Sequence, residues 1–299
     1  MNKAQTPKGF KDYLPKMAKR KRVLLQKIGD TLENLGFEPI ETPTLEFAQA
    51  LLGKYGEEAD RLVYTFEDRG GRKLALRYDL TVPLARFISS NPSVLNSGVF
   101  RRFQVGQVFR GENPQKGRYR EFTQFDMDSV GSSDLSEDAK VVAAVLICCQ
   151  VLGLKGAKMQ INDRKNFDGL STDVVVTIDK LDKIGDGGVI KELKTKGISN
   201  AKQILEEVKN KKPTPDLKKI FAILKEMGVS EDQIEFVPTL ARGLDYYTGA
   251  IFELQAPSYG NLSLGAGGRY NNLIGMFSGK EIPAVGFSFG LERLLEALS

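Results

Sequence analysis

The chain has 299 residues, with 43 Lys and Arg against 38 Asp and Glu, and a hydrophobic fraction of 41%. This predicts one large or two ordinary domains with a sizeable core, and the formal charge of +5 permits, without requiring, a polyanionic partner such as RNA or a nucleotide. The sequence contains no histidine, which excludes His-based catalytic triads and every His-ligated metal site.

The two cysteines, Cys148 and Cys149, are neighbours in an apolar run. Adjacent cysteines do not readily bridge and lack the spacing of a zinc site, so a reducing, cytoplasmic location is expected. The opening residues, MNKAQTPKGFKDYLP, contain no apolar signal region. The longest apolar run, 141–154, is too short to cross a bilayer, so no membrane partner is expected.

The first quarter of the chain alternates between helical and extended patterns. Apolar residues at helical spacing predict a helix over 17–35, and an extended segment over 37–45 follows. Two short apolar runs, 62–66 and 73–77, flank a turn rich in glycine and charge, which is typical of a hairpin.

A second strand–loop–strand unit is expected at 99–110 and 117–130. The apolar run 141–154 then predicts a buried helix, capped by Ser132 or Ser133.

Lysine becomes dense between 173 and 237, and the pattern turns helical. We therefore expect a small helical insertion, 169–235, in a β-rich core formed by 1–168 and 236–299. Its lysines are most simply interpreted as a solvated face, and RNA contact is the less favoured interpretation.

Strands are predicted again at 250–254, 262–264 and 285–289, and 290–298 is expected to form a helix. Hairpins and strands with few intervening helices favour an α+β fold with an antiparallel sheet over a doubly wound parallel sheet.

Polar residues follow the hairpin in LRYDLTVP, 76–83. If this segment is a strand, Asp79 and Thr81 share one of its faces. Without further context, a solvated edge strand is the simpler interpretation.

The segment 117–128, GRYREFTQFDMD, has an unusual alternation. In a strand, one face would carry six residues of mixed character: Arg118, Arg120, Phe122, Gln124, Asp126 and Asp128. Arg110 ends the preceding strand, and guanidinium groups at a hairpin mouth suit phosphate because their planar fork binds two oxygens.

Glycines cluster in ARGLDYYTG, 241–249, and in GAGGRY, 265–270, ahead of GFSFGLERL, 286–294. No Gly-Lys-Ser/Thr follows them, and there is no strand–GxGxxG–helix fingerprint, so phosphate-loop folds are excluded. Such clusters are most often tight turns, and any nucleotide bound here would be held by arginines.

These segments together resemble the catalytic core of class II aminoacyl-tRNA synthetases, and specifically the histidyl-tRNA synthetase family. The helix 17–35 with the strand near Pro43 resembles motif 1, FRGENPQKGRYREFTQFD resembles motif 2, and GFSFGLERL resembles motif 3. RGLDYYTG, GAGGRY and the opening TPKGFKDYLP resemble the histidine-specific signatures. The resemblance covers nearly the whole chain, in the family's order.

The resemblance implies a class II antiparallel sheet flanked by helices, and a reaction that joins L-histidine to ATP and then to tRNA(His), with Mg²⁺. It also implies a homodimer through motif 1. Its catalytic residues would be Arg110, Arg242 and Arg293. Its ATP site would be formed by Arg110, Glu112, Arg118, Phe122 and Arg293. Its histidine site would be formed by Asp79, Thr81, Gln124, Asp128, Arg242, Tyr246, Tyr247 and Tyr270.

Some residues match no role in the family. Arg120 and Asp126 are interpreted as structural, paired with neighbouring charges. Gln115 and Lys116 would either touch the acceptor end of tRNA or be solvated, and the sequence does not favour one over the other.

The chain departs from the family pattern in two respects. The usual C-terminal anticodon-binding domain is expected to be absent, and Asp79 and Asp128 stand where many bacterial members carry glutamate. An alternative is a non-aminoacylating regulatory subunit of ATP phosphoribosyltransferase, which resembles the same core. Retention of Arg110, Arg242 and Arg293 argues against it, because a histidine sensor does not need to grip ATP.

Overall fold

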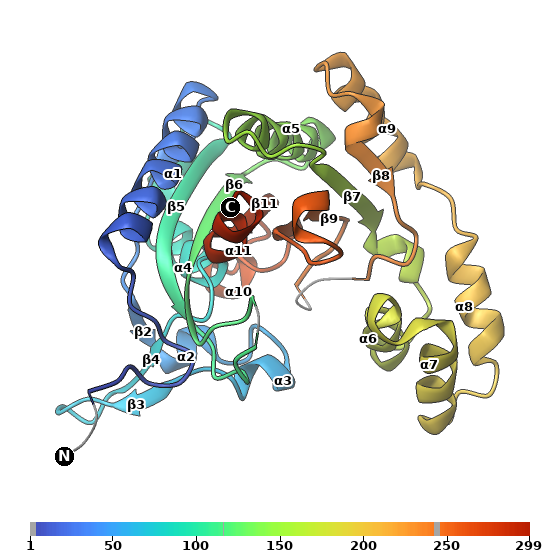
Figure 1. Ribbon diagram of the computed structural model, residues 1–299, viewed down its shortest axis with the longest axis horizontal. Helices are drawn as coiled ribbons and strands as arrows, with labels where there is room; N and C mark the ends of the chain where they lie inside the picture. The colour runs from blue at the N-terminus through green and yellow to red at the C-terminus, as the bar shows by residue number, and fades with distance from the viewer. Residues whose placement is uncertain (1–3, 116, 242–245) are drawn as a thin grey trace.

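The computed structural model describes residues 4–115, 117–241 and 246–299, and its centre is an eight-stranded sheet (Figure 1). The strand order is β1-β5-β6-β11-β10-β9-β7-β8. The strands are β1 (Glu38–Pro39), β5 (Phe100–Phe109), β6 (Glu121–Val130), β7 (Lys158–Asp163), β8 (Ile234–Phe236), β9 (Ala250–Gln255), β10 (Gly265–Arg269) and β11 (Ala284–Gly290). All neighbours are antiparallel except at the two edges, where β1 lies parallel to β5 and β8 to β7. The predicted α+β class is confirmed.

Long helices cover the outer face of this sheet in Figure 1. They are α1 (Pro15–Asn34), α5 (Leu135–Val151) and α9 (Pro215–Glu226). Their apolar faces share one core with Phe125 and Met127 of β6 and with residues of the C-terminal helix α11 (Leu291–Ala297). The helices predicted at 17–35 and 290–298 are thus confirmed. No helix in the described parts of the chain has the length and apolar character needed to cross a membrane.

The buried helix α5 begins one or two residues later than the predicted cap implies. Asp134, not Ser132 or Ser133, is its N-cap, because the Asp134 carboxylate accepts a hydrogen bond from the Ser136 backbone N–H at 2.7 Å. The Ser132 hydroxyl accepts from the Asp134 backbone N–H instead, at 3.1 Å. The cap predicted from the sequence was therefore wrong by one or two residues.

A small second sheet contains the predicted hairpin. Its order is β2-β4-β3, formed by β2 (Leu45–Phe47), β3 (Thr65–Glu67) and β4 (Lys73–Leu76), all antiparallel. Short helices α2 (Ala48–Leu51) and α3 (Glu57–Asp60) lie between β2 and β3. The hairpin is confirmed, with β2 as an additional strand from the extended segment.

The segment 76–83 is not the predicted strand. β4 ends at Leu76, and α4 (Thr81–Ser90) begins five residues later. Asp79 Oδ1 accepts a hydrogen bond from the Val82 backbone N–H at 3.1 Å, as at a helix N-terminus. Pro83 lies in the first turn of the helix, where a missing N–H costs nothing. Asp79 and Thr81 consequently do not share a strand face.

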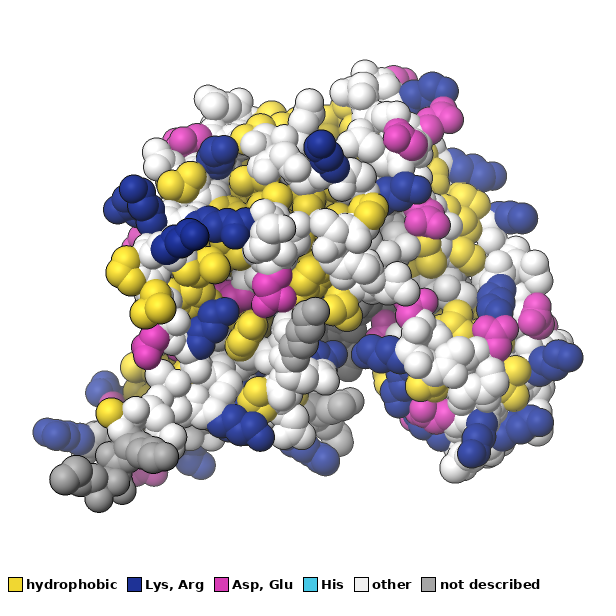
Figure 2. Space-filling view, in the orientation of Figure 1, with side chains coloured by type: hydrophobic (Ala, Val, Ile, Leu, Met, Phe, Trp, Pro, Cys, Tyr) yellow, Lys and Arg dark blue, Asp and Glu magenta, His cyan; other side chains and the backbone are white. Residues whose placement is uncertain are grey.

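The lysine-rich region forms α6 (Thr172–Ile178), α7 (Leu181–Thr195) and α8 (Ala201–Lys209), at the lower right of Figure 1. These three helices have an apolar cluster of their own, joined by Phe167, Leu240 and Ile251, whereas α9 packs with the main core. Figure 2 shows their basic side chains interspersed with acidic ones, and pairs such as Lys180–Glu192 and Lys209–Asp186 agree with a solvated face. The boundaries of the insertion stay a prediction.

The GAGGRY glycines lie in strand β10, not in a tight turn, and the strand predicted at 262–264 is displaced to Gly265–Arg269. A side chain at Gly267 would put its Cβ 2.1 Å from the Gly286 carbonyl oxygen of β11. Glycine therefore allows β10 and β11 to approach closely.

The sequence analysis missed β7 and β8 altogether. The remaining short elements are α10 (Gly275–Ser278) and the 3₁₀ turns η1 (Pro92–Leu95), η2 (Arg164–Phe167), η3 (Glu231–Gln233) and η4 (Pro257–Tyr259).

Candidate active site

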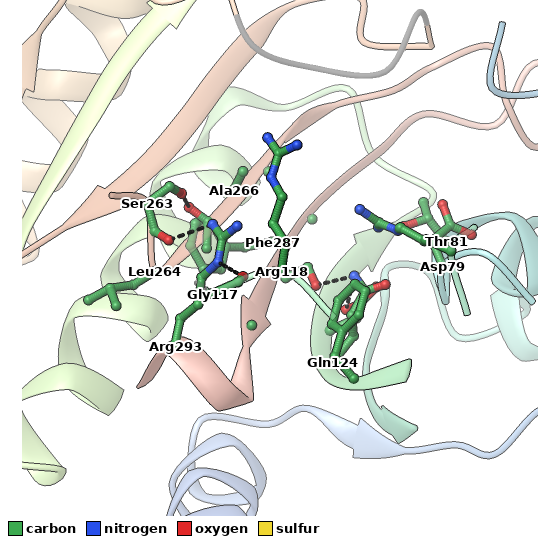
Figure 3. Close-up of a pocket in the computed structure, with 18 of the residues that line it drawn as sticks. Asp79, Thr81, Gly117, Arg118, Gln124, Ser263, Leu264, Ala266, Phe287 and Arg293 are labelled. Atoms are coloured by element: carbon green, nitrogen blue, oxygen red, sulfur yellow. Dashed lines mark hydrogen bonds between the residues drawn. The ribbon is translucent and has the colours of Figure 1, made fainter. Parts of the chain in front are cut away.

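A pocket of about 360 Å³ lies on the face of the large sheet opposite the helices α1 and α5 (Figure 3). Its floor is formed by β6, β10 and β11, and its walls come from the segment before α4, from the start of α11 and from Tyr246 and Tyr247. The volume is in the range of small-molecule sites, which hold roughly 300–1,000 Å³. We call it the central pocket.

The alternation noted in GRYREFTQFDMD is confirmed over β6. Gln124, Asp126 and Asp128 face the central pocket, while Phe125 and Met127 point into the apolar core on the other side. Arg118 and Phe122, further up the same row, also line the pocket. Arg120 does not line it, because its Nε donates to the Glu112 carbonyl oxygen at 3.0 Å.

Asp128 occupies the deepest part of the row. The Tyr270 hydroxyl donates to its Oδ1, and Arg102 Nη2 lies 2.7 Å from its Oδ2. Burial raises the pKa of Asp128, and the Arg102 charge and the Tyr270 hydrogen bond oppose that rise. A Cβ at Gly286 would lie 1.8 Å from Asp128 Oδ1, so this carboxylate fits only beside a glycine.

Asp79 stands across the pocket from β6. Its Oδ1 accepts hydrogen bonds from the Tyr55 hydroxyl at 3.0 Å and from the Val82 backbone N–H. Burial raises the pKa of Asp79 to about 6, although these hydrogen bonds and the charge of Arg110 lower it. Thr81 also lines the pocket. Tyr55 was missed by the sequence analysis, since no motif marks it.

Asp126, interpreted from the sequence as structural, lines the same pocket. Burial raises its pKa to about 7; the charge of Arg102 opposes this rise and that of Asp128 adds to it. Gln124 Nε2 donates to Asp126 Oδ1 at 3.4 Å and to the Ser288 hydroxyl at 2.6 Å. The strand period was the available signal, because Asp126 shares the parity of Gln124 and Asp128.

Two buried acceptors of this end are unused. Asp79 Oδ2 and Gln124 Oε1 accept no hydrogen bond from any described residue. Unsatisfied buried oxygens are costly, so a ligand or water with N–H or O–H donors is needed there. This end of the central pocket therefore suits a cationic, donor-rich ligand.

Three tyrosines border the same end. The rings of Tyr246 and Tyr247 are 4.9 Å apart and those of Tyr246 and Tyr270 are 5.8 Å apart, all edge to face. Arg242, which the sequence placed in the same site, lies outside the described residues, as does Lys116.

The other end of the pocket is rich in arginine. Arg110 Nε donates to the Tyr78 carbonyl oxygen at 3.1 Å, and its guanidinium lies 4.4 Å from the centre of the Tyr78 ring and 5.0 Å from that of Phe122. Arg118 Nη1 lies 3.6 Å from Glu112 Oε2. This guanidinium is 43% exposed and faces open solvent more than the groups near Asp128 do.

Arg293, at the start of α11, is fixed by backbone oxygens. Its Nε donates to the Gly117 carbonyl and its Nη1 to the Ser263 carbonyl, each at 2.9 Å (Figure 3). The neighbouring Glu292 accepts from the Thr123 backbone N–H at 3.0 Å and from the Tyr13 hydroxyl at 2.8 Å. The N-terminal signature, which contains Tyr13, thus braces the helix that carries Arg293, a link the sequence did not indicate.

The described residues contain no group of three or more His, Cys, Asp or Glu that could hold a metal ion. Mg²⁺ usually needs only one or two carboxylates together with substrate phosphates and water. The central pocket therefore fits Mg²⁺ that enters with a nucleotide, with Glu112 and Glu292 as the nearest carboxylates of the arginine-rich end.

Comparison with known proteins identifies the fold and family. The sequence pattern described as histidyl-tRNA synthetase matches residues 9–187 and 189–294. A histidine–tRNA ligase of Aeropyrum pernix is 40% identical, over 97% of this chain and 73% of its own length. The structure of a Nostoc histidyl-tRNA synthetase superposes with a TM-score of 0.83 at 28% identity, covering 100% of this chain and 76% of the other.

A third protein bears on the alternative function. The Bacillus halodurans structure described as an ATP phosphoribosyltransferase regulatory subunit/histidyl-tRNA synthetase has a TM-score of 0.80 at 25% identity, covering 99% of this chain and 84% of its own. That description joins both functions, so the likeness of fold does not by itself distinguish them. The match to the family pattern over most of the chain and the identity to curated relatives nevertheless assign this chain to the histidyl-tRNA synthetase family.

Proposed function

We propose that the chain is the catalytic core of a histidine–tRNA ligase. It activates L-histidine with ATP to histidyl-adenylate and pyrophosphate, and then transfers the histidyl group to tRNA(His). The observation that carries this proposal is the division of the central pocket into a buried carboxylate end and an open arginine end, joined along one strand.

The carboxylate end suits L-histidine. Its α-ammonium group has three N–H donors, which match the unused Asp79 Oδ2 and Gln124 Oε1. Neutral imidazole has one N–H donor and one acceptor nitrogen. Asp128 would accept the N–H, and the Tyr247 hydroxyl would donate to the other nitrogen, since the Tyr270 hydroxyl already donates to Asp128. Thr81 and Tyr246 complete the wall, and Arg242 is proposed to hold the substrate carboxylate.

The arginine end suits the triphosphate of ATP. Arg110 is proposed to contact the α-phosphate, Arg293 the γ-phosphate and Arg118 a further oxygen, since guanidinium forks bind phosphate oxygens in pairs. Glu112 and Phe122 are proposed to meet the adenine base by hydrogen bonding and stacking. Mg²⁺ would neutralise part of the phosphate charge.

The reaction needs no general base. A carboxylate oxygen of histidine attacks the α-phosphorus of ATP, and the bond from that phosphorus to the bridging oxygen of pyrophosphate breaks. Because the nucleophile is already an anion, the main task is to hold two anions together and stabilise the charge of the transition state. Fixed arginines do this, which agrees with a chain that has no histidine.

The tRNA is proposed to approach at the rim of the pocket. Asp179 and Lys183, at the junction of α6 and α7, border the pocket opposite β6. The helical insertion is therefore proposed to lie where the acceptor end would enter, and Gln115 belongs to the loop on the other side. A cytoplasmic location is proposed because the family acts in translation.

We also propose a homodimer that uses the small sheet and α1. On one face of that sheet, Phe47, Leu74 and Phe66 are aligned across β2, β4 and β3, and Phe47 and Phe66 are 51% and 45% exposed. On α1, Met17 and Val23 are also exposed. An apolar face of this kind is typical of a protein interface.

The proposed interface is tested with Phe47→Asp, which should give monomers in light scattering after size exclusion. Met227→Asp, a control at the equally exposed end of α9, should not. A dimeric Phe47→Asp protein would contradict the proposed interface.

The regulatory-subunit function remains the second candidate, because the Bacillus halodurans structure shares the fold. A histidine sensor would need the carboxylate end alone. The arginine end, with Arg110 and Arg293 both held in place by backbone oxygens, favours the ligase.

The deciding experiment is ATP–pyrophosphate exchange with purified protein, Mg²⁺ and L-histidine. We expect exchange that depends on histidine and is not supported by other amino acids. Arg242→Ala should lower the exchange rate far more than it lowers histidine affinity. Histidine binding without any exchange would reject the ligase and support the regulatory function.

A further inference from the structure

The most buried charge next to the proposed histidine site belongs to a residue without an assigned role. Arg102 of β5 is 0% exposed and is the largest side chain that the fold buries completely. It stands directly opposite Asp128 in the β5–β6 register. It is not among the residues that line the central pocket, so a ligand in the pocket meets Asp128 and not Arg102.

Stability alone gives no reason for this arrangement. Taking a guanidinium and a carboxylate out of water costs free energy, and apolar side chains of similar volume are often equally stable. Moreover, none of the three guanidinium nitrogens of Arg102 makes a hydrogen bond to a described residue, so its contact with Asp128 is an ion pair only. The pair is therefore a poor device for holding β5 to β6, which already pair along ten residues.

Its effect on the pocket is clearer. The charge of Arg102 lowers the pKa of three buried carboxyl groups, which burial raises: Asp79, Asp126 and Asp128. The Arg102 charge also lies against one oxygen of Asp128, and the Tyr270 hydroxyl donates a hydrogen bond to the other. The carboxylate is thereby held in one orientation on the pocket floor.

The other charged and titratable groups around Asp128 and Asp126 do not replace Arg102. They are Asp79 before α4, Arg77 after β4, and Tyr247 and Tyr270 at the wall. Two of them, Tyr247 and Tyr270, are neutral at physiological pH, as tyrosine usually is, and burial raises their pKa further. Arg77 is directed elsewhere, donating to the carbonyl oxygens of Gln107 and Thr42.

We propose that Arg102 is a positioning residue for amino-acid specificity, whose buried guanidinium keeps the Asp128 carboxylate charged and oriented toward the imidazole of bound histidine. This inference rests on the proposed function. It assigns to Arg102 no contact with substrate. Removal of the guanidinium would leave Asp128 buried without a counter-charge, and Asp128 would then take up a proton and lose its ability to accept the imidazole N–H.

The test is calorimetric titration of L-histidine into wild-type protein and Arg102→Met between pH 6 and pH 9. Arg102→Met should bind histidine at least about tenfold more weakly at pH 7, and the pH midpoint of its binding should rise by more than about one unit. Its KM for ATP should be unchanged. Arg102→Lys should restore part of the affinity, since it returns the charge without the fork.

The matched control is Arg101→Met. Arg101 is the adjacent residue of β5, and its ion pair with Glu137 is remote from the pocket. It should bind histidine as the wild type does. If Arg102→Met does not fold, Arg102→Met/Asp128→Asn, which has no uncompensated charge, takes its place, and weak binding whose pH midpoint does not rise above that of the wild type is then expected.

Wild-type affinity and pH profile in Arg102→Met, or wild-type affinity in the double variant, would overturn the inference while leaving the proposed function intact. An equal loss for histidine and ATP at every pH would also overturn it, because it would indicate general damage. Failure of the wild type itself to bind histidine would instead refute the proposed function.

Discussion

The two ends of the central pocket differ in how far their charged side chains are buried. At the carboxylate end, Asp126 and Asp128 are 2% exposed, their strand is paired on both sides, and Asp128 accepts a buried hydrogen bond from Tyr270. At the arginine end, the Arg118 side chain is 43% exposed, and its ion pair with Glu112 is long, at 3.6 Å. The difference indicates that recognition of the amino acid depends on a rigid, buried site, whereas the nucleotide end relies on charge that solvent partly screens.

The largest expected effect comes from Gly286→Ala. The new Cβ would lie 1.8 Å from Asp128 Oδ1, so the carboxylate or β11 must move. We expect histidine-dependent exchange to disappear and the free energy of unfolding to fall by about 1–3 kcal/mol. Gly187→Ala is the control, since nothing lies within 4 Å of the Cβ position there. Wild-type exchange in Gly286→Ala would show that the carboxylate end is not rigid.

Arg110→Ala should have the next largest effect. Because its guanidinium is held between Tyr78 and Phe122, it is positioned in advance for the charge that develops on the α-phosphate. Loss of such a fixed group typically lowers kcat by about 10²–10³-fold. Steady-state exchange should show this, with Arg72→Ala, whose ion pair lies on the exposed hairpin, as an unaffected control. A change confined to KM for histidine would indicate that Arg110 acts at the carboxylate end, and would contradict its proposed contact with the α-phosphate.

A smaller effect is expected from pH. The folded-state pKa of Asp126 is raised to about 7 by burial, so its contribution to stability is complete below the unfolded value near 4 and is lost as pH rises through about 7. In chemical denaturation, the wild-type apoprotein should lose stability between pH 4 and pH 7 relative to Asp126→Asn, by roughly 1.4 kcal/mol for each pH unit in this range. Parallel pH profiles for the two proteins would contradict the buried, charged floor.

Arg118→Ala should have the smallest effect. An exposed arginine contributes little because water and salt screen it, and we expect KM for ATP to rise only about two- to tenfold. That rise should shrink at 0.5 M NaCl, whereas the Arg110→Ala effect should persist. If Arg118→Ala were as defective as Arg110→Ala, the proposed difference between the exposed Arg118 and the fixed Arg110 would be contradicted.

Much of this arrangement could be predicted from local patterns. The period of two along 117–128 predicted which side chains of β6 share a face, and the helical spacing over 17–35 predicted α1. The segment 76–83 was misassigned because its apolar residues fit a strand as well as a helix start, and only the Asp79 contact with Val82 distinguishes them. The glycines of β10 were misread as a turn because the reason for them, the nearby β11 backbone, is distant in the sequence.

The residues that support the site could not be found in this way. Tyr55 and Arg102 reach the central pocket or its floor from two separate segments of the chain. Their importance depends on burial and on partners that are 24 and 26 residues away, and no local period or motif marks such pairs. The place of Asp126 in the pocket could have been predicted, since it shares the parity of Asp128. It matched no role in the family and was therefore interpreted as structural.

The most direct test of the division between the two ends is one pair of kinetic constants. In ATP–pyrophosphate exchange, KM for histidine and KM for ATP are measured for the wild type and for Asp128→Asn. Because Asn keeps the shape of the side chain but removes the charged acceptor, we predict that KM for histidine rises about 100-fold or more while KM for ATP stays within about twofold. An unchanged KM for histidine, or an equal rise in both constants, would contradict the account.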